Sequence, residues 1–271
     1  MIIESAASIS GKASQVVRRL ALPLTAVLLS LVFLVSCGAD AARRKEQAGI
    51  HTEIGSAYIT SGDYAKALKE LLEAKELDPG EPKIHYYLAM AYAGQGFEQE
   101  ALRECREAIS LNPDYSEAHN YLGTLYLGRG QAQEAIASFR KALANILYET
   151  PAVALYNMGR AYAQMNDYTM AMDSYRRAAE RDQRGDILPL IELEMGRISC
   201  LKGDYPEAFH HLAKSLDAVP NFLEARYVRA ECYRLQGRMD KAREEYKDII
   251  RLAPSSEFAK KAREVLSERP H

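Results

Sequence analysis

A spacing of 34 residues recurs through most of this 271-residue chain. The spacing appears in three registers at once, as Tyr58, Tyr92 and Tyr126, as Gly62, Gly96 and Gly130, and as Ala67, Ala101 and Ala135. A unit of this length cannot bury its apolar residues alone, so the period indicates an array in which each unit packs against its neighbours.

Six units follow from this spacing, beginning at Ala48, Pro82, Ser116, Ala152, Pro189 and Leu223. The eighth position is always small, as Gly55, Ala89, Gly123, Gly159, Gly196 and Ala230. The twentieth is always alanine, as Ala67, Ala101, Ala135, Ala171, Ala208 and Ala242. Small side chains at fixed positions allow two helices to approach closely. Proline cannot continue a helix, so second helices should end before Pro79, Pro113, Pro220 and Pro254.

This pattern resembles the tetratricopeptide repeat, a helix-turn-helix unit of 34 residues. The resemblance implies an all-α fold: a right-handed superhelix, or α-solenoid, of six repeats over residues 48–256, with a concave surface lined by the first helices. A C-terminal capping helix and tail should fill residues 257–271, with Phe258, Ala262, Val265 and Leu266 on its apolar face.

The spacing departs from 34 on both sides of unit four, where Gly123 to Gly159 is 36 residues and Gly159 to Gly196 is 37. The first insertion falls near residues 148–151, where Thr150 has the properties of an N-cap and Pro151 those of a first helical residue. The second falls in the polar stretch 181–186. Either unit four is tilted in the array, or the loops absorb the extra residues.

The N-terminal segment 1–36 has the composition of an export signal. Lys12, Arg18 and Arg19 precede an uncharged apolar run from Leu20 to Ser36. This order of a basic region, an apolar region and small residues is typical of a cleaved signal peptide. An uncleaved anchor helix is the alternative, although the run is short for a bilayer span and contains Pro23.

The tetrad Leu34-Val35-Ser36-Cys37 resembles the lipobox of bacterial lipoproteins. The resemblance implies cleavage before Cys37 and lipidation of that residue, which would anchor the mature chain stably to a membrane. Gly38 stands where the family's inner-membrane retention signal has Asp, which favours the outer membrane, facing the periplasm. Residues 37–47 are then the lipidated cysteine and a short polar tether.

No catalytic constellation is visible, because the chain has no G-x-S-x-G, G-x-x-x-x-G-K-[ST], H-E-x-x-H or C-x-x-C motif. We therefore expect no enzymatic activity and no cofactor. A net charge of -2 and the lack of a local basic stripe give no support to nucleic-acid binding.

His51, His85 and His119 share the fourth position of units one to three. Zinc holds nitrogen ligands at about 2.0 to 2.1 Å, whereas packed helices lie about 8 to 10 Å apart, so successive repeats are poorly placed to share an ion. We expect a packing role for these rings and no metal site.

Three cysteines follow Cys37. Cys105 occupies the twenty-fourth position of unit two and should be a small buried residue. Cys200 and Cys232 lie on the first helices of adjacent units, at positions twelve and ten. A disulfide between them is conceivable, but the two positions point in different directions, so we expect them to remain unpaired.

The tetratricopeptide resemblance implies a groove lined by positions two, five, nine and twelve. The candidate partner-binding residues are Tyr86, Met90, Asn120, Leu127, Tyr156, Arg160, Arg197, Tyr227 and Arg234. Thr52, Ile59, Leu193 and Glu231 share these positions. Tyrosine is a good anchor for a peptide, although solenoid packing explains the same residues. The three arginines could hold a carboxylate-bearing segment, unless a neighbour such as Glu231 neutralises Arg197.

The whole organisation is similar to the type IV pilus pilotin lipoproteins of the PilF/PilW kind, which are six-repeat outer-membrane lipoproteins. The stretches 147–151 and 155–159 look like that family's irregular third-to-fourth junction. The resemblance implies a protein scaffold that helps the pilus secretin reach the membrane and multimerise, with a segment of the secretin or another envelope protein as partner. A general periplasmic scaffold, for polysaccharide export or cell-wall synthesis, is the alternative.

Overall fold

The computed structural model describes residues 40–267. The predicted signal segment and Cys37 lie outside the described residues. The described chain contains helices joined by turns and loops, and no strand. It divides into two compact units, one ending at Ala101 and the other beginning at Leu102.

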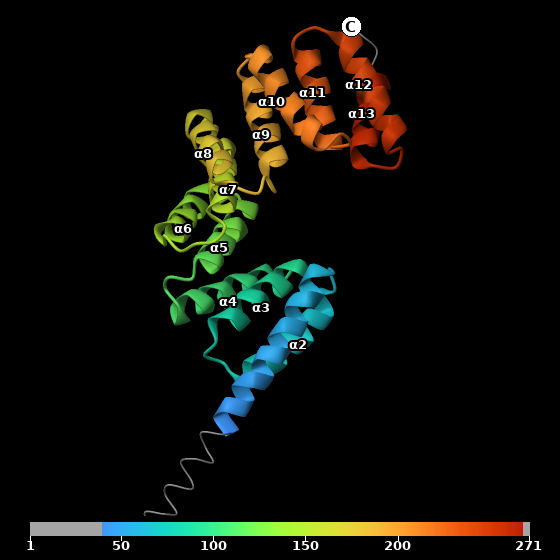
Figure 1. Cartoon of the computed structure of the whole chain (residues 1–271). Coiled ribbons are helices and arrows are strands. Elements are labelled where there is room, and N and C mark those ends of the chain that lie inside the picture. The colour runs from blue at the N-terminus through green and yellow to red at the C-terminus, as the bar shows by residue number, and fades with distance from the viewer. Residues whose placement is uncertain (1–39, 268–271) are drawn as a thin grey trace, which may run out of the picture. The chain divides into compact units, whose positions relative to one another are not determined.

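A helix over residues 40–60 is followed by twelve more within the described range. Their bounds are α2 Tyr64–Leu77, α3 Pro82–Gly94, α4 Glu98–Leu111, α5 Ser116–Gly128, α6 Ala132–Ala144, α7 Pro151–Gln164, α8 Tyr168–Arg181, α9 Leu188–Leu201, α10 Tyr205–Ala218, α11 Leu223–Leu235, α12 Met239–Leu252 and α13 Glu257–Ser267. Pairs such as α7 and α8, or α9 and α10, form antiparallel hairpins (Figure 1). The predicted all-α fold of helix-pair repeats is confirmed.

The first described helix differs from the prediction, because residues 40–47 are helical rather than a polar tether. The segment contains a run of residues from Ala41 to Gln47 that are mostly strong helix formers. Ala48 is buried with Ala67, Leu71 and Ala74 of α2. This packing makes residues 40–60 one continuous first helix.

The contact between positions 8 and 24 confirms the assigned register. A Cβ added to Gly55 would lie 2.6 Å from the Leu71 side chain, and one added to Gly196 would lie 2.7 Å from that of Leu212. Gly123 meets the ring of Phe139 in the same way, and Gly159 meets that of Tyr175. These four repeats therefore need a residue without a side chain where their two helices cross.

The turn between the helices of each repeat needs a left-handed backbone at position 15. Glycine provides it in five repeats, as Gly62, Gly96, Gly130, Gly203 and Gly237. Repeat four has Asn166, with φ of 60°, in its place. Asparagine tolerates this conformation better than other residues with a side chain, which explains how repeat four keeps the same turn.

The predicted helix ends agree with the structure. Helices α2, α4, α10 and α12 each end two residues before a proline. Pro151 is the first residue of α7 and Thr150 occupies the N-cap position, although the Thr150 side chain forms no capping hydrogen bond. The extra residues beside repeat four lie in the loops 145–150 and 182–187.

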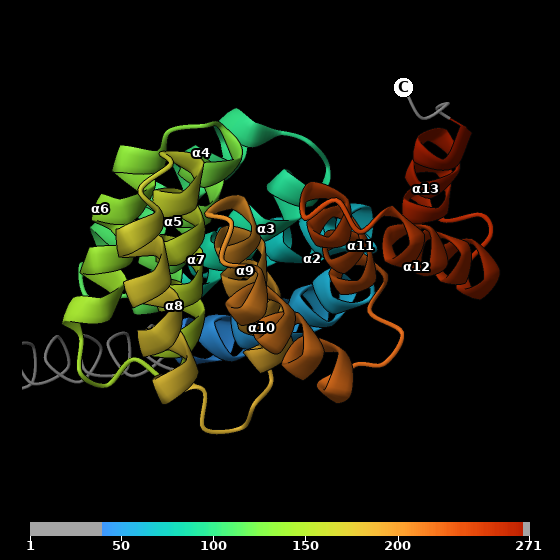
Figure 2. The same cartoon turned by 90° about the horizontal axis from the view of Figure 1, so that it is seen from above.

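The predicted capping helix is confirmed as α13, which packs beside α12 (Figure 2). Ala259 and Ala262 are buried against Tyr246 and Ile249, with Phe258, Val265 and Leu266 around them. The last repeat is therefore covered by an amphipathic helix, as a repeat array requires.

Cys200 and Cys232 form a disulfide, so the expectation that they remain unpaired was wrong. Their Cα atoms lie 5.6 Å apart, within the usual range for a bridge. The helices α9 and α11 are in contact, which brings the two positions together despite their different offsets. Cys105 is a buried free thiol, as predicted.

Candidate partner-binding surface

In the C-terminal unit, the predicted groove residues gather charged and aromatic side chains around Tyr156 of α7. The pKa of Tyr156 is raised to about 12, mainly by burial and also by Glu194 and Glu224, while Arg160 and Arg197 act to lower it. These groups therefore lie close enough to influence one another electrostatically. At neutral pH the Tyr156 phenol is protonated and can donate a hydrogen bond to a partner.

Arg197 is held between two carboxylates. Its Nε donates to Glu194 Oε2 at 3.1 Å, and its Nη2 donates to Glu224 Oε1 at 2.6 Å. The predicted neutralisation of this arginine is therefore real, but its partners are Glu194 and Glu224 rather than Glu231. The guanidinium ties α9 to α11 and has little capacity left for a client carboxylate.

Arg234 is also paired within the chain. Its Nε and Nη2 donate to Glu231 Oε2 at 3.1 and 2.7 Å, and the other oxygen of Glu231 accepts a hydrogen bond from Tyr246. Tyr227 lies beside this network, with its ring centroid 5.8 Å from that of Tyr246. Repeat six thus holds its aromatic rings in fixed positions beside an arginine whose charge is already paired with Glu231.

Arg160 differs from the other two arginines. Its guanidinium carbon lies 5.9 Å from the centroid of the Tyr156 ring, and the side chain is exposed. No carboxylate among the described residues lies within ion-pairing distance of it. Of the three arginines predicted to line the groove, Arg160 alone presents an unneutralised charge to a partner.

The remaining predicted groove residues of this unit have different degrees of exposure. Asn120 is half-buried and accepts a hydrogen bond from the Asn157 side chain at 3.3 Å. Leu127 is only 8% exposed and Leu193 only 1%, and both belong to hydrophobic clusters. These two leucines hold the fold together and offer little area to a partner.

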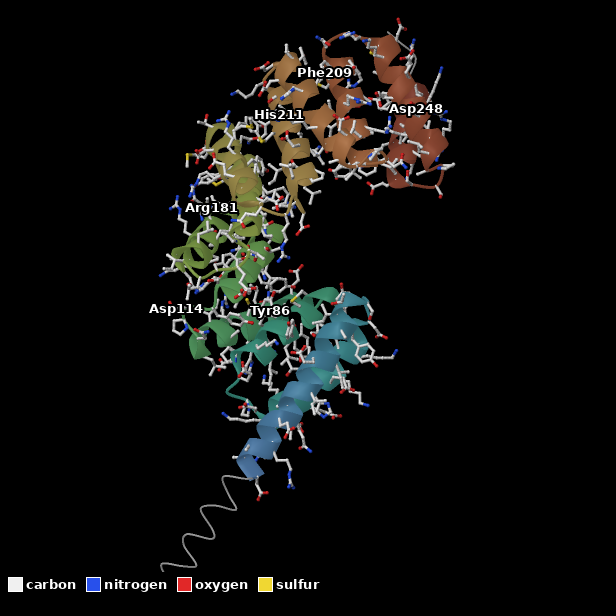
Figure 3. The ribbon with its side chains drawn as sticks, viewed as in Figure 1. Tyr86, Asp114, Arg181, Phe209, His211 and Asp248 are labelled. Carbon is white, nitrogen blue, oxygen red and sulfur yellow. A yellow bond between two sulfur atoms is a disulfide. The ribbon has the colours of Figure 1, made fainter. Side chains whose placement is uncertain are left out.

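In the N-terminal unit, Tyr86 and Met90 of α3 are half-buried. The Tyr86 ring lies 5.2 Å from the Tyr87 ring, and Lys83 Nζ lies 2.7 Å from Glu53 Oε1 at the start of the same helix. Figure 3 labels Tyr86 on this unit. Thr52 is buried and its hydroxyl donates to Ala48 O, so it supports the helix instead of facing a partner.

The histidines at position four bind backbone or carboxylate groups of their own repeat and the preceding turn. The Nε2 atoms of His85 and His119 lie 2.9 and 2.8 Å from the carbonyl oxygens of Pro79 and Pro113. Arg226, at the same position of repeat six, donates to Pro220 O. These side chains secure the turn between repeats, a role that the sequence prediction of simple packing did not include.

The turn before α7 displays two apolar residues that the sequence analysis missed. Ile146 is 95% exposed and Leu147 is 80% exposed. The turn is ordered by Asn145, whose Oδ1 accepts from Leu147 N at 2.9 Å, and by Tyr148, which is buried beneath it. The sequence signal was available, because two aliphatic residues follow Asn145 in a segment that falls outside the helical period.

Family models described as tetratricopeptide or TPR repeats match four stretches of the chain: residues 55–96, 82–115, 114–184 and 201–266. The matches leave residues 185–200 as the one gap between residues 55 and 266, and this gap contains nearly all of α9, the first helix of repeat five. The chain is a tetratricopeptide-repeat protein. No curated protein is similar enough in sequence to match it.

Solved tetratricopeptide-repeat structures resemble this protein in fold. PilW, described as a widely conserved type IV pilus biogenesis factor, is 24% identical with a TM-score of 0.74, covering 81% of this chain and 98% of PilW. PilF of Pseudomonas aeruginosa is 20% identical with a TM-score of 0.71, covering 83% of this chain and 99% of PilF. YrrB, described as a TPR protein with an unusual peptide-binding site, is 21% identical with a TM-score of 0.53, covering 72% of this chain and 97% of YrrB.

Within residues 40–267, no helix has both the length and the apolar composition that a membrane span requires. The lipobox-like tetrad lies outside this range, so lipidation of Cys37 stays a prediction.

Proposed function

We propose that this tetratricopeptide-repeat protein is a non-enzymatic outer-membrane lipoprotein that binds a segment of an envelope protein during type IV pilus biogenesis, and so helps the pilus secretin to localise and assemble. The observation that carries the proposal is the extent of the match to PilW and PilF, whose folds are covered almost completely by this chain. The agreement extends over 81% and 83% of this chain, and so over more than a single repeat.

The N-terminal sequence supports a membrane-anchored role. Residue 40, only three residues after Cys37, already belongs to the first described helix. A lipid at Cys37 would therefore hold the first repeat close to the bilayer surface, on the periplasmic face of the outer membrane. This placement suits a protein that delivers a client to that membrane.

The chemistry of the C-terminal unit indicates the kind of segment that would bind. Tyr156 and Tyr227 offer rigid aromatic area with hydroxyl groups, and Arg160 offers an exposed guanidinium beside the Tyr156 ring. A partner with an apolar side chain near a carboxylate would complement this surface.

Deletion of the gene tests the pilus role. We expect the secretin to lose its detergent-resistant multimers, and the full-length chain to restore them. The Cys37→Ser variant should accumulate as precursor and fail to restore them. Secretin multimers that form equally well in the deletion strain would contradict the proposal.

A general periplasmic scaffold for another envelope assembly is the second candidate. Its support is the TPR fold itself and the likeness to YrrB, which is described by its peptide-binding site. An unaffected secretin together with loss of polysaccharide export or cell-wall synthesis in the deletion strain would favour this candidate.

A further inference from the structure

A polar contact between positions 4 and 23 recurs inside the repeats, between the two helices of one hairpin. His51 Nδ1 lies 2.8 Å from Glu70 Oε2 in repeat one. In repeat five the residue types are exchanged, and His211 Nδ1 lies 2.5 Å from Glu192 Oε2. In repeat six Arg226 pairs with Glu245 at 3.5 Å. The fold therefore places a carboxylate beside a histidine or an arginine at the same position in several repeats.

Position 26 adds a third group to this contact, and its charge differs between repeats one and five. In repeat five it is Lys214, whose Nζ lies 3.6 Å from Glu192 Oε1 and supplies a cation. In repeat one it is Glu73, whose Oε2 lies 3.7 Å from His51 Nε2. Repeat one thus places two carboxylates around one imidazole with no cation at position 26. In repeat five His211 also faces a second carboxylate, since its Nε2 lies 3.1 Å from Glu207 Oε1, but Lys214 adds a positive charge beside Glu192.

The three side chains of repeat one are arranged as a set of metal ligands. Glu70 and Glu73 are three residues apart on α2 and therefore share one face of that helix, opposite His51. One ligand atom from each residue can be chosen so that all lie within 4.8 Å of one another. Tetrahedral bonds of about 2.0 Å place neighbouring ligand atoms about 3.3 Å apart. Glu70 faces Nδ1 of His51 and Glu73 faces Nε2, so an ion bound to one of these nitrogens requires the carboxylate beside the other nitrogen to rotate toward it.

The site can be reached from solvent. His51 and Glu73 line an open hollow of about 630 Å³, together with Arg44, Gln47, Ile50 and Leu77. His51 and Glu70 are partly buried, with 29% and 20% of their side chains exposed, while Glu73 is 50% exposed. Two ligands are thus held by packing, and an ion and a water molecule could enter from the side of Glu73.

We propose that His51, Glu70 and Glu73 bind a divalent transition metal ion, best satisfied by Zn²⁺ with water as the fourth ligand. An imidazole with two carboxylates matches zinc, whereas calcium and magnesium prefer oxygen ligands alone. The ion would join residues 40–60 to α2 and so stabilise the first repeat of the array. This site lies within one repeat and does not require the three position-four histidines to share an ion.

Zinc titration of the purified full chain in detergent, after treatment with a chelator, tests the proposal. We expect one high-affinity equivalent of Zn²⁺ at pH 7.5, measured by competition with a chromogenic chelator. His51→Gln and Glu73→Gln should each weaken that binding by at least tenfold. Zinc should also raise the thermal midpoint of the wild-type protein and leave that of His51→Gln unchanged.

His119→Gln is the matched control, because His119 occupies the same repeat position but lies against the Pro113 carbonyl without this pair of carboxylates. It should bind zinc as the wild-type protein does. Circular dichroism of the metal-free variants establishes that each is folded. Absence of a high-affinity equivalent in the wild type, or unchanged binding in either His51→Gln or Glu73→Gln, would overturn the proposal.

Discussion

The imidazole of His211 lies 2.5 Å from the carboxylate of Glu192, and the pair joins the two helices of repeat five in the interior of the hairpin. Figure 3 shows His211 on α10 near Phe209. Both side chains are almost fully buried, and Lys214 approaches the other oxygen of Glu192. A buried, hydrogen-bonded pair that contains a carboxylate is costly to break, because the remaining partner keeps its desolvation penalty.

This pair should make stability depend on pH. Burial alone would raise the pKa of Glu192, but the hydrogen bond from His211, together with Lys214, holds it below its ordinary value of 4.5. A lowered carboxyl pKa contributes stability above the unfolded-state pKa, and that contribution is lost as the pH falls through the lower folded-state value. Glu192→Gln should therefore cost about 1.5 to 3 kcal/mol at pH 7.

Urea denaturation between pH 3 and pH 8 measures this effect. The difference between the wild type and Glu192→Gln should shrink below pH 4.5. Glu180→Gln, at an exposed residue of α8, serves as the control and should leave the midpoint unchanged. A difference that is constant across this pH range would show that the Glu192 charge does not stabilise the repeat.

Gly123→Leu should destabilise repeat three by about 1 to 3 kcal/mol, because the new side chain would collide with the ring of Phe139. Gly128→Ala is the control in the same helix, since no atom lies near its added Cβ. Chemical denaturation distinguishes the two. Equal midpoints for Gly123→Leu and the wild type would contradict the helix contact described here.

Asn166→Ala should cost about 1 to 2 kcal/mol, because alanine lacks the local hydrogen bonding that helps asparagine adopt a positive φ. Asn166→Gly should be tolerated, since glycine occupies this position in the other five repeats. Thermal unfolding of the two variants measures the difference. A similar loss in both would indicate that the Asn166 side chain, rather than the backbone angle, matters.

Reduction of the Cys200–Cys232 disulfide should lower the free energy of unfolding by about 3 to 4 kcal/mol, since the bridge closes a loop between residues 32 apart. The Cys200→Ala/Cys232→Ala variant should be insensitive to dithiothreitol. Cys105→Ala is the control, because Cys105 is a free thiol outside the bridge. Burial raises the pKa of the Cys105 thiol to about 12, so this residue should also resist alkylation in the folded protein. If dithiothreitol lowers the free energy of unfolding of the double variant as much as that of the wild type, the bridge is not the cause of the loss.

Under the proposed function, Arg160→Ala should weaken client binding by about tenfold, or about 1.4 kcal/mol, and reduce its salt dependence. Adding Arg234→Ala should have a smaller further effect, because Arg234 already pairs with Glu231. Calorimetry with a purified secretin segment at low and high salt measures both. Arg177→Ala, on a second helix and paired with Asp173, is the matched control. Equal losses in Arg160→Ala and Arg177→Ala would show that binding does not involve this face.

The sequence by itself determined the repeat register, the all-α class and most helix bounds. These properties follow from local rules: the 34-residue period, small residues at position 8, glycine in the turn and proline after the second helix. The contacts of Gly55 with Leu71 and of Gly196 with Leu212 agree with that register. Helix α13 also agrees, because its apolar face is visible in the order of its residues.

Only the tertiary structure decided which side chains meet across repeats. Arg197 reaches Glu224 of the next repeat instead of Glu231, and Cys200 reaches Cys232 although their repeat positions differ. Such pairs depend on the angle between neighbouring hairpins and on the rotamers of long side chains, which a repeat period does not encode. Arg160 differs from the two neutralised arginines partly for a local reason, since Arg197 and Arg234 each follow a glutamate by three residues on the same helix, whereas Arg160 follows Asn157. Only the further pairing of Arg197 with Glu224 required the tertiary structure, because a position in the repeat specifies a helix face but not the neighbour that occupies it.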